Sequence, residues 1–166
     1  SDPLFENEEK RLKERIRELL EIDGSRSATS FHKEIGKILY NKCGLIREKT
    51  QLQEALEELR ALQESFYKEL KVPRESMTLN SELEKAGRVA DYFELAQLIV
   101  QDALTREESC GAHFRQEYQT EDGEARRDDE RFCFVSVWQH DTEGPAKLHR
   151  EPLEFQEVKL TKRSYK

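Results

Sequence analysis

Apolar residues recur at three- and four-residue intervals through most of the first two thirds of the chain. The repeat is clearest over residues 48–70, where its members are Leu52, Leu56, Leu59, Leu62 and Phe66. A second segment begins at Asn80 or Ser81, either of which can cap a helix, and its apolar residues continue to Leu104. Its apolar surface is broader, so more than one neighbour should cover it. Because a 3.6-residue period gathers such side chains on one face, both segments are predicted to be helices packed against other helices.

Two further helices are predicted before this pair. Residues 4–22 form the first, and Asp23-Gly24-Ser25 ends it, with Gly24 in the left-handed conformation. Thr29 or Ser30 begins the second, whose apolar face reaches Ile46; Gly44 either ends this helix or bends it. The predicted fold class is therefore mainly α: an antiparallel three-helix bundle, preceded by an N-terminal helix and followed by a small two-stranded or irregular extension.

The helical period ends after Gly111. Asp122-Gly123 indicates a turn, and residues 132–138 have the aromatic and β-branched content of a strand. Leu153–Leu160 is the second strand candidate, and two strands alone are marginal in water. We expect three parts: residues 1–27 as N-terminal helix and linker, 28–116 as the bundle domain, and 117–166 as the C-terminal extension.

The composition limits the classes of function. Charged residues make up 38% of the chain and the net charge is −7, which argues against a broad nucleic-acid surface. No segment has the run of apolar residues that a membrane span needs. Three cysteines, an odd number without CxxC spacing, fit free thiols in a reducing compartment. A cytoplasmic location is expected.

The chemical motifs give no catalytic, cofactor-binding or metal-binding residue in this chain. The four histidines and three cysteines lack metal-ligand spacing, and no two glycines form GxG, so a stand-alone flavin or nucleotide enzyme is disfavoured. Cys110 near His113 leaves open a small thiol enzyme, although a structural thiol is favoured. Gly36 and Gly87 lie inside predicted helices, either as tolerated residues or as points of close helix approach.

A dense alternation of Arg, acidic, His and small residues follows the last predicted helix. Arg forks and carboxylates fix geometry well, so this segment suits a helix end that docks onto another polar surface. We expect a domain-interface motif made of Arg106, Glu108, Ser109, Gly111, His113, Arg115, Arg127, Asp128 and Asp129.

This motif resembles the C-terminal part of the flavoprotein subunit of succinate dehydrogenase and fumarate reductase, an architecture that L-aspartate oxidase shares. That family carries R-x-E-S-R-G-x-H-x-R-x-D followed by R-D-D-x-x-W, and the nine residues named above match it. Residues 42–47, 83–90 and 158–165 are also similar to the family, so the resemblance covers roughly residues 30–166.

The chain departs from the family pattern at several positions. Cys110 stands in place of Arg, Glu117 in place of Asp, and Phe132 in place of Trp, while residues 119–125 form an insertion. These departures resemble the longer form of the subunit, which occurs in complexes anchored by a di-haem cytochrome b.

The resemblance implies that the chemistry lies elsewhere. In the family, upstream domains bind FAD and supply the His that attaches it, the substrate-binding residues and the proton-shuttling Arg. The parent protein interconverts succinate and fumarate and passes electrons to iron–sulfur clusters, on the cytoplasmic face of the inner membrane. The region matched here would be inactive alone and would pack on the flavin domain and the iron–sulfur subunit.

Two expectations follow for the surface. If partners are missing, an exposed patch should surround Phe114, Phe132 and Trp138. The alternative function is a free-standing helical scaffold that binds proteins through the apolar stripe of residues 48–70.

Overall fold

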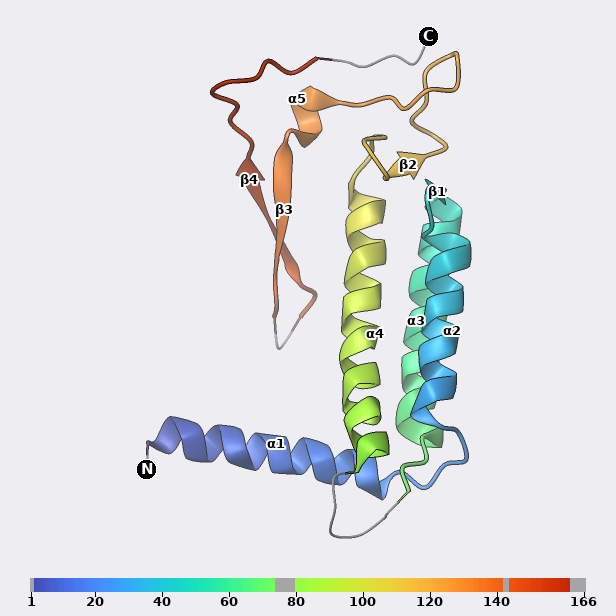
Figure 1. Ribbon diagram of the computed structural model, residues 1–166, viewed down its shortest axis with the longest axis vertical. Coiled ribbons are helices and arrows are strands. Elements are labelled where there is room, and N and C mark those ends of the chain that lie inside the picture. Colours follow the sequence, from blue (N-terminus) through green and yellow to red (C-terminus); the bar gives the residue numbers. More distant parts are fainter. Residues whose placement is uncertain (1, 74–79, 142–143, 162–166) are drawn as a thin grey trace.

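The computed structural model describes residues 2–73, 80–141 and 144–161. Residues 162–165, part of the family-like tail, lie outside this description. The fold is mainly helical, as predicted (Figure 1). The four long helices are α1 (Pro3–Glu21), α2 (Ala28–Lys42), α3 (Lys49–Glu69) and α4 (Ser81–Thr105).

Helices α2, α3 and α4 run up, down and up beside one another and share one apolar core (Figure 1). Phe66, in the last turn of α3, joins the three helices, with ring centroids 5.2 Å from Phe31 of α2 and 5.5 Å from Phe93 of α4. All three rings are fully buried, and each contributes about 1.5–3 kcal/mol to folding. The predicted stripe from Leu52 to Phe66 is the part of this core that α3 provides.

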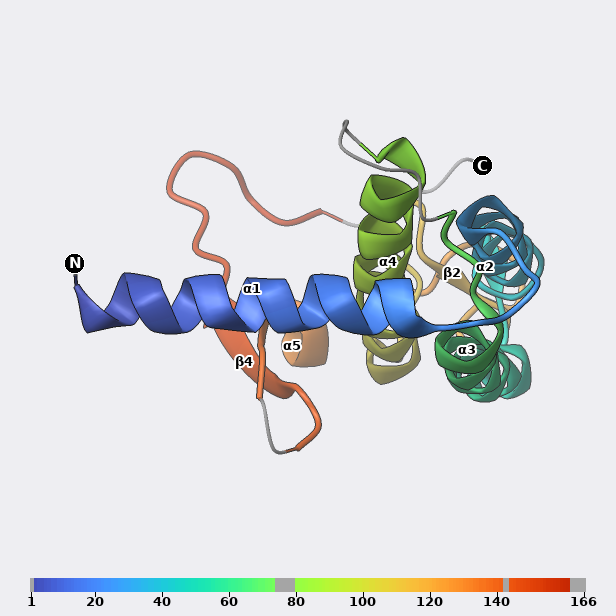
Figure 2. The same cartoon turned by 90° about the horizontal axis from the view of Figure 1, so that it is seen from below.

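Helix α1 lies across one end of the bundle and projects beyond it (Figures 1 and 2). Only its C-terminal part is held: Leu19 is buried, and Arg15 pairs with Asp91 of α4. Closer to the N-terminus, the large apolar side chains Leu4, Phe5, Leu12 and Ile16 are exposed. The helix is therefore formed but only partly packed.

The linker after α1 lies directly on the end of α3. Gly24 N–H donates to the Leu70 carbonyl at 3.0 Å, and the N–H groups of Ser25 and Arg26 donate to the Glu69 carbonyl. A Cβ on Gly24 would come within 2.0 Å of the Glu69 carbonyl carbon and oxygen. The predicted left-handed Gly24 is wrong, because its φ is not positive; close backbone approach requires glycine here.

The ends of α2 and α4 test the predicted caps. Ser27, rather than Thr29 or Ser30, begins α2, because its hydroxyl accepts from Ser30 N–H. Asn80 caps α4, as one of the two predicted candidates. A Cβ on Gly36 or Gly87 would meet nothing within 4 Å, so the close-approach interpretation of these glycines is wrong.

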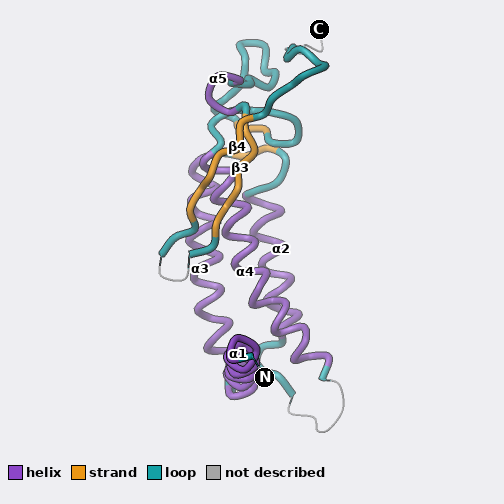
Figure 3. Tube along the Cα trace, turned by 90° about the vertical axis from the view of Figure 1, so that its left-hand side faces the viewer, coloured by secondary structure: helices purple, strands orange, loops and turns teal. Residues whose placement is uncertain are grey.

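Short strands complete the chain. β1 (Ile46–Arg47) pairs in parallel with β2 (Phe114–Arg115), and a short helix α5 (Asp129–Phe132) leads to a hairpin. The hairpin joins β3 (Phe134–Gln139) and β4 (Lys147–Pro152) with antiparallel pairing. It lies over α3 and α4 (Figure 3), and Trp138 Nε1 donates to Asp102 of α4 at 2.8 Å.

The second predicted strand is wrong: residues 153–160 contain none, and β4 precedes them. β4 is exposed on nearly every residue, so it has no alternation of apolar side chains. Its position is set by hydrogen bonding to β3, which a side-chain pattern does not record. Within the described residues, no helix combines the length and apolar character that would suit a bilayer interior.

Candidate functional site: the polar junction at the end of α4

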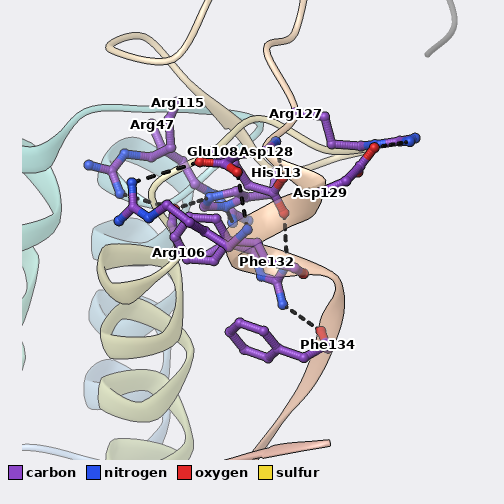
Figure 4. A network of polar contacts seen from close by, with 11 residues as sticks. Arg47, Arg106, Glu108, His113, Arg115, Arg127, Asp128, Asp129, Phe132 and Phe134 are labelled. Carbon is purple, nitrogen blue, oxygen red and sulfur yellow. Dashed lines mark hydrogen bonds and ion pairs between the residues drawn. The ribbon is translucent and has the colours of Figure 1, made fainter. Parts of the chain in front are cut away.

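The predicted motif residues gather beyond the C-terminal end of α4, between the α2–α3 connection and the C-terminal extension (Figure 4). We call this cluster the polar junction. Its members are Arg47, Arg106, Glu108, Ser109, His113, Arg115 and Glu117. Arg47 was not among the predicted residues, and Glu117 was noted only as a departure from the family pattern.

Arg106 holds the extension to the bundle. Its guanidinium donates to the carbonyls of Phe132 at 3.0 Å and Phe134 at 2.9 Å. It also pairs with Glu108 at 2.7 Å. The second oxygen of Glu108, a side chain only 3% exposed, accepts from Asp128 N–H at 2.8 Å. Both oxygens of the buried Glu108 carboxylate are therefore hydrogen-bonded, which is the condition for tolerating a buried charge.

Arg115 closes the C-terminal end of α4. The residue is 1% exposed, and its Nη1 donates to the carbonyls of Ala103 at 2.9 Å and Leu104 at 3.3 Å. These carbonyls have no partner within the helix and carry the negative end of its dipole. A buried guanidinium at this position satisfies both the hydrogen bonds and the charge.

Ser109 and Gly111 shape the chain between these arginines. The Ser109 hydroxyl accepts from Arg115 N–H at 2.8 Å and donates to the Arg115 carbonyl at 3.1 Å. Cys110 and His113 exchange two main-chain hydrogen bonds, and Gly111 within that turn has φ +57°. Glycine favours this left-handed conformation. The small residues of the motif therefore make a tight reversal that returns the chain to the end of α4.

His113 lies between two fixed partners. Its Nε2 is 2.9 Å from the Arg106 carbonyl, and its Nδ1 is 2.6 Å from Arg47 Nη1. Burial lowers the pKa of His113, and Arg47, Arg115 and Arg106 lower it further, although the bond to the Arg106 carbonyl opposes them. The imidazole is therefore held in its neutral form at neutral pH.

Glu117 extends the junction to α3. Its carboxylate pairs with Arg115 at 3.1 Å and accepts from Lys49 N–H at the first turn of α3. The side chain of the N-cap residue of α3 makes no capping hydrogen bond of its own to the helix backbone. Burial raises the pKa of Glu117, but hydrogen bonds from Lys49 and Arg115 outweigh it, so the pKa is lowered. This carboxylate thus links the ends of two helices.

The second half of the predicted motif lies at the edge of the junction. Asp128 caps α5 by accepting from Arg131 N–H at 3.1 Å. Arg127 forms a two-bond pair with Asp129 and also donates to the Thr161 carbonyl at 3.3 Å. Asp128 thus joins the junction through its main chain, whereas the Arg127–Asp129 pair fastens the tail.

Several residues of the predicted interface motif contact their own chain instead of facing outward. Glu108, Ser109 and Arg115 are buried against their own polypeptide, so these three side chains do not face outward. The predicted patch is wrong for Phe132, which is buried, while Phe114 and Trp138 are half-buried. Main-chain carbonyls supply much of the docking surface, and a side-chain pattern cannot reveal them.

The thiol-enzyme alternative gains no support from the geometry. Burial and Glu108 raise the pKa of the Cys110 thiol, although Arg127 and Arg106 oppose them. Both ring nitrogens of His113 are already engaged, so this imidazole is not available as a base for Cys110. Among the described residues, no three His, Cys, Asp or Glu side chains group in a way that would hold a metal ion.

Comparisons with known proteins agree with this architecture. The family described as "Fumarate reductase flavoprotein C-term" matches residues 32–165. The fumarate reductase flavoprotein subunit of Serratia sp. is 28% identical over 151 residues, which are 91% of this chain and 24% of that protein. The Helicobacter pylori subunit is 30% identical over 145 residues, 86% of this chain and 19% of that protein. The chain thus spans a quarter or less of the length of these relatives.

Solved structures share the fold. A mutant of Escherichia coli quinol fumarate reductase superposes with a TM-score of 0.83 at 23% identity, over 98% of this chain and 27% of the other. A Mycobacterium smegmatis Sdh1 complex gives a TM-score of 0.71 at 20% identity, over 94% of this chain and 25% of the other. The chain belongs to the family of fumarate reductase flavoprotein C-terminal regions.

Proposed function

We propose that this chain is the structural brace of a larger flavoprotein and is catalytically silent by itself. The parent protein would interconvert succinate and fumarate, with electrons passing from FAD to iron–sulfur clusters. The family match supports this assignment over a free-standing scaffold. The polar junction supports the absence of chemistry in this region, because its buried polar side chains are bonded within the chain.

The observation that carries the proposal is the set of large apolar side chains left exposed on α1, α4 and the hairpin. Helix α1 and the hairpin both project from the same side of the bundle (Figures 1 and 2). Exposed apolar side chains lie on α1, α4 and β3: Leu4, Phe5, Leu12, Ile16, Leu95, Ile99, Val135 and Val137. Surfaces of this kind normally contact another protein.

A groove of about 700 Å³ adds to this surface. It lies between α3, α4 and the hairpin, and Leu95, Leu98, Trp138 and Pro145 are among its lining residues. We propose that the flavin-binding domain of the same polypeptide covers this side, and that the iron–sulfur subunit contacts the assembled pair. The membrane would be reached only indirectly, through a cytochrome b anchor on the cytoplasmic face of the inner membrane.

We also propose the di-haem type of anchor and the three-part division into residues 1–27, 28–116 and 117–166. The insertion, residues 119–125, supports the di-haem type of anchor, because it forms a compact loop with its own hydrogen bonds. Thr120 N–H donates to the Glu124 carbonyl at 2.9 Å, and Gly123 has φ +81°. The longer connection thus leaves the bond between Ser109 N–H and the Arg126 carbonyl in place.

The brace assignment is tested by tagging the gene product at its C-terminus in its own organism. The expected product is several times longer than this chain, contains flavin and reduces fumarate with a reduced viologen dye. The purified 166-residue chain, supplied with FAD and succinate, should show no turnover. Turnover by this chain alone, or a tagged product of its size without flavin, would reject the assignment.

A matched pair of variants tests the proposed surface. Leu95→Glu places a charge on exposed α4 beside the groove, whereas Tyr40→Glu places one on α2, away from the hairpin. Neither should unfold the isolated chain, because both side chains are exposed. In the full-length protein, Leu95→Glu alone should reduce the yield of flavin-containing complex. Equal yields for the two variants would contradict the proposed surface.

A further inference from the structure

The α2–α3 connection is joined to the end of α4 by few contacts. β1 and β2 contribute two residues each, and their main-chain bonds run from Phe114 N–H to the Leu45 carbonyl at 3.3 Å and from Gln116 N–H to the Arg47 carbonyl at 2.9 Å. So short a parallel pair has little stability of its own. Two side-chain bonds span the same joint: the 2.6 Å contact between Arg47 and His113, and the bond from Lys49 N–H to the Glu117 carboxylate.

The two partners of His113 allow one protonation state. Nε2 faces the Arg106 carbonyl, which only accepts, so this nitrogen must carry a hydrogen. Nδ1 faces the guanidinium of Arg47, which only donates, so this nitrogen must be an unprotonated acceptor. A proton on Nδ1 would therefore place the N–H of a charged imidazole against an N–H of the charged Arg47 guanidinium, and the two groups would repel each other.

The surroundings do not compensate such a charge. Arg47 faces His113 from the α2–α3 connection, Arg106 from the end of α4, and Arg115 from β2. The carboxylates in the junction are committed elsewhere, because Glu108 pairs with Arg106 and Glu117 pairs with Arg115. Arg47 itself makes no ion pair with an acidic side chain within the described ranges, and its Nε donates to the Gly44 carbonyl.

We propose that Arg47, His113 and the Arg106 carbonyl form an acid-sensitive latch. At neutral pH the latch joins the α2–α3 connection to the end of α4, and proton uptake by His113 releases it. Release separates Arg47 from the imidazole and opens the β1–β2 pairing, while the apolar core of α2, α3 and α4 is unaffected. This device is independent of the proposed function, because it needs only the contacts within this chain.

The direction of the pH dependence follows from the lowered pKa of His113. The open form binds its proton near the ordinary pKa of about 6.5, and the closed form binds it only at lower pH. The open fraction therefore grows by about tenfold for each pH unit between these two values. Between about pH 7.5 and about pH 5, the increase can reach about thirtyfold when the closed-form pKa lies well below that range.

Amide hydrogen exchange of the full 166-residue chain measures this opening. After correction for intrinsic exchange, the amides of Phe114 and Gln116 should exchange at least about threefold faster at the lower pH. The amide of Lys71, bonded to the Arg26 carbonyl at the far end of the bundle, should not change. A smaller increase at Phe114 and Gln116, or an equal increase at Lys71, would overturn the proposal.

Variants identify the responsible group. His113→Gln should abolish the increase, whereas the matched control His149→Gln, on the exposed hairpin, should retain it. Arg47→Gln should raise the pKa of His113 measured by NMR and reduce the increase. If His113→Gln does not fold, the wild-type titration decides: His113 must titrate below the ordinary value of about 6.5, and titration at or above that value refutes the latch.

Discussion

Gly24→Ala should be one of the most damaging small substitutions in this chain. The added Cβ would lie 2.0 Å from the carbonyl carbon and oxygen of Glu69, against the 3.0 Å that real Cβ atoms essentially never go below. The neighbours are backbone atoms at the end of α3, so no flexible side chain can move aside. The linker would have to shift by about 1 Å or more to remove the overlap, the difference between those two distances.

Such a shift breaks a defined set of bonds. The three main-chain bonds from Gly24, Ser25 and Arg26 to the end of α3 are 2.9–3.0 Å long, so an added 1 Å removes them all. Each contributes about 0.5–1.5 kcal/mol net, which predicts a loss of about 3 kcal/mol in the free energy of unfolding. Helix α1 is attached by this linker together with Leu19 and the Arg15–Asp91 pair, so its attachment should weaken as the linker shifts.

Urea unfolding followed by circular dichroism measures the loss, with Gly36→Ala as the matched control. Gly36 is mid-helix in α2 with open space around its Cβ position. Replacing it should therefore stabilise the protein by about 0.5–1 kcal/mol. The same chemical change is thus expected to act with opposite signs at two sites. A Gly24→Ala protein within about 0.5 kcal/mol of wild type would refute the close-approach argument.

Three further substitutions test single contacts, each by urea unfolding. Arg106→Met leaves the Glu108 charge buried without its partner, so we expect a loss of about 3–5 kcal/mol and rapid proteolysis of the extension. Glu117→Ala removes the acceptor at the start of α3 and should cost about 1 kcal/mol. Because the pKa of Glu117 is lowered, its contribution to stability is present above the ordinary value of about 4.3 and is lost as the pH falls through the lowered value. A stability difference between Glu117→Ala and wild type that persists in strong acid would contradict this assignment. Trp138→Phe leaves Asp102 without the indole donor and should cost about 1 kcal/mol, whereas an unchanged stability would mean that the hairpin bond is replaced by water.

The helices could be predicted because their signal is carried by side chains. The repeat from Leu52 to Phe66 reports directly which face of α3 is buried, and Asn80 reports a cap that its own side chain makes. Gly24 is a position where side-chain patterns fail. The sequence shows a glycine there but not whether the fold needs a positive φ or the lack of a Cβ. Only the approach of α3, distant in sequence, distinguishes a left-handed turn from a close backbone contact.

Most members of the polar junction could be predicted from the sequence, but the groups that their side chains bond to could not. Paired arginines and acids predicted that the end of α4 docks on another polar surface; within this chain, Arg106 and Arg115 donate to its own main-chain carbonyls. These acceptors are the main-chain carbonyls of Phe132, Phe134 and α4 itself, a chemical group that every residue carries whatever its side chain. Arg47 was missed for a related reason: its partner His113 is far away along the chain, and the β1–β2 pairing brings them together.

The last carbonyls of helix α4 receive hydrogen bonds from a residue outside the helix. The guanidinium that bonds to the carbonyls of Ala103 and Leu104 belongs to Arg115, which the ribosome adds only after the helix has been made. Until then the last turn frays, and a gene truncated at Thr105 would leave it permanently open. Any shortened version intended to isolate the bundle should therefore run past Glu117, whose carboxylate steadies that same arginine.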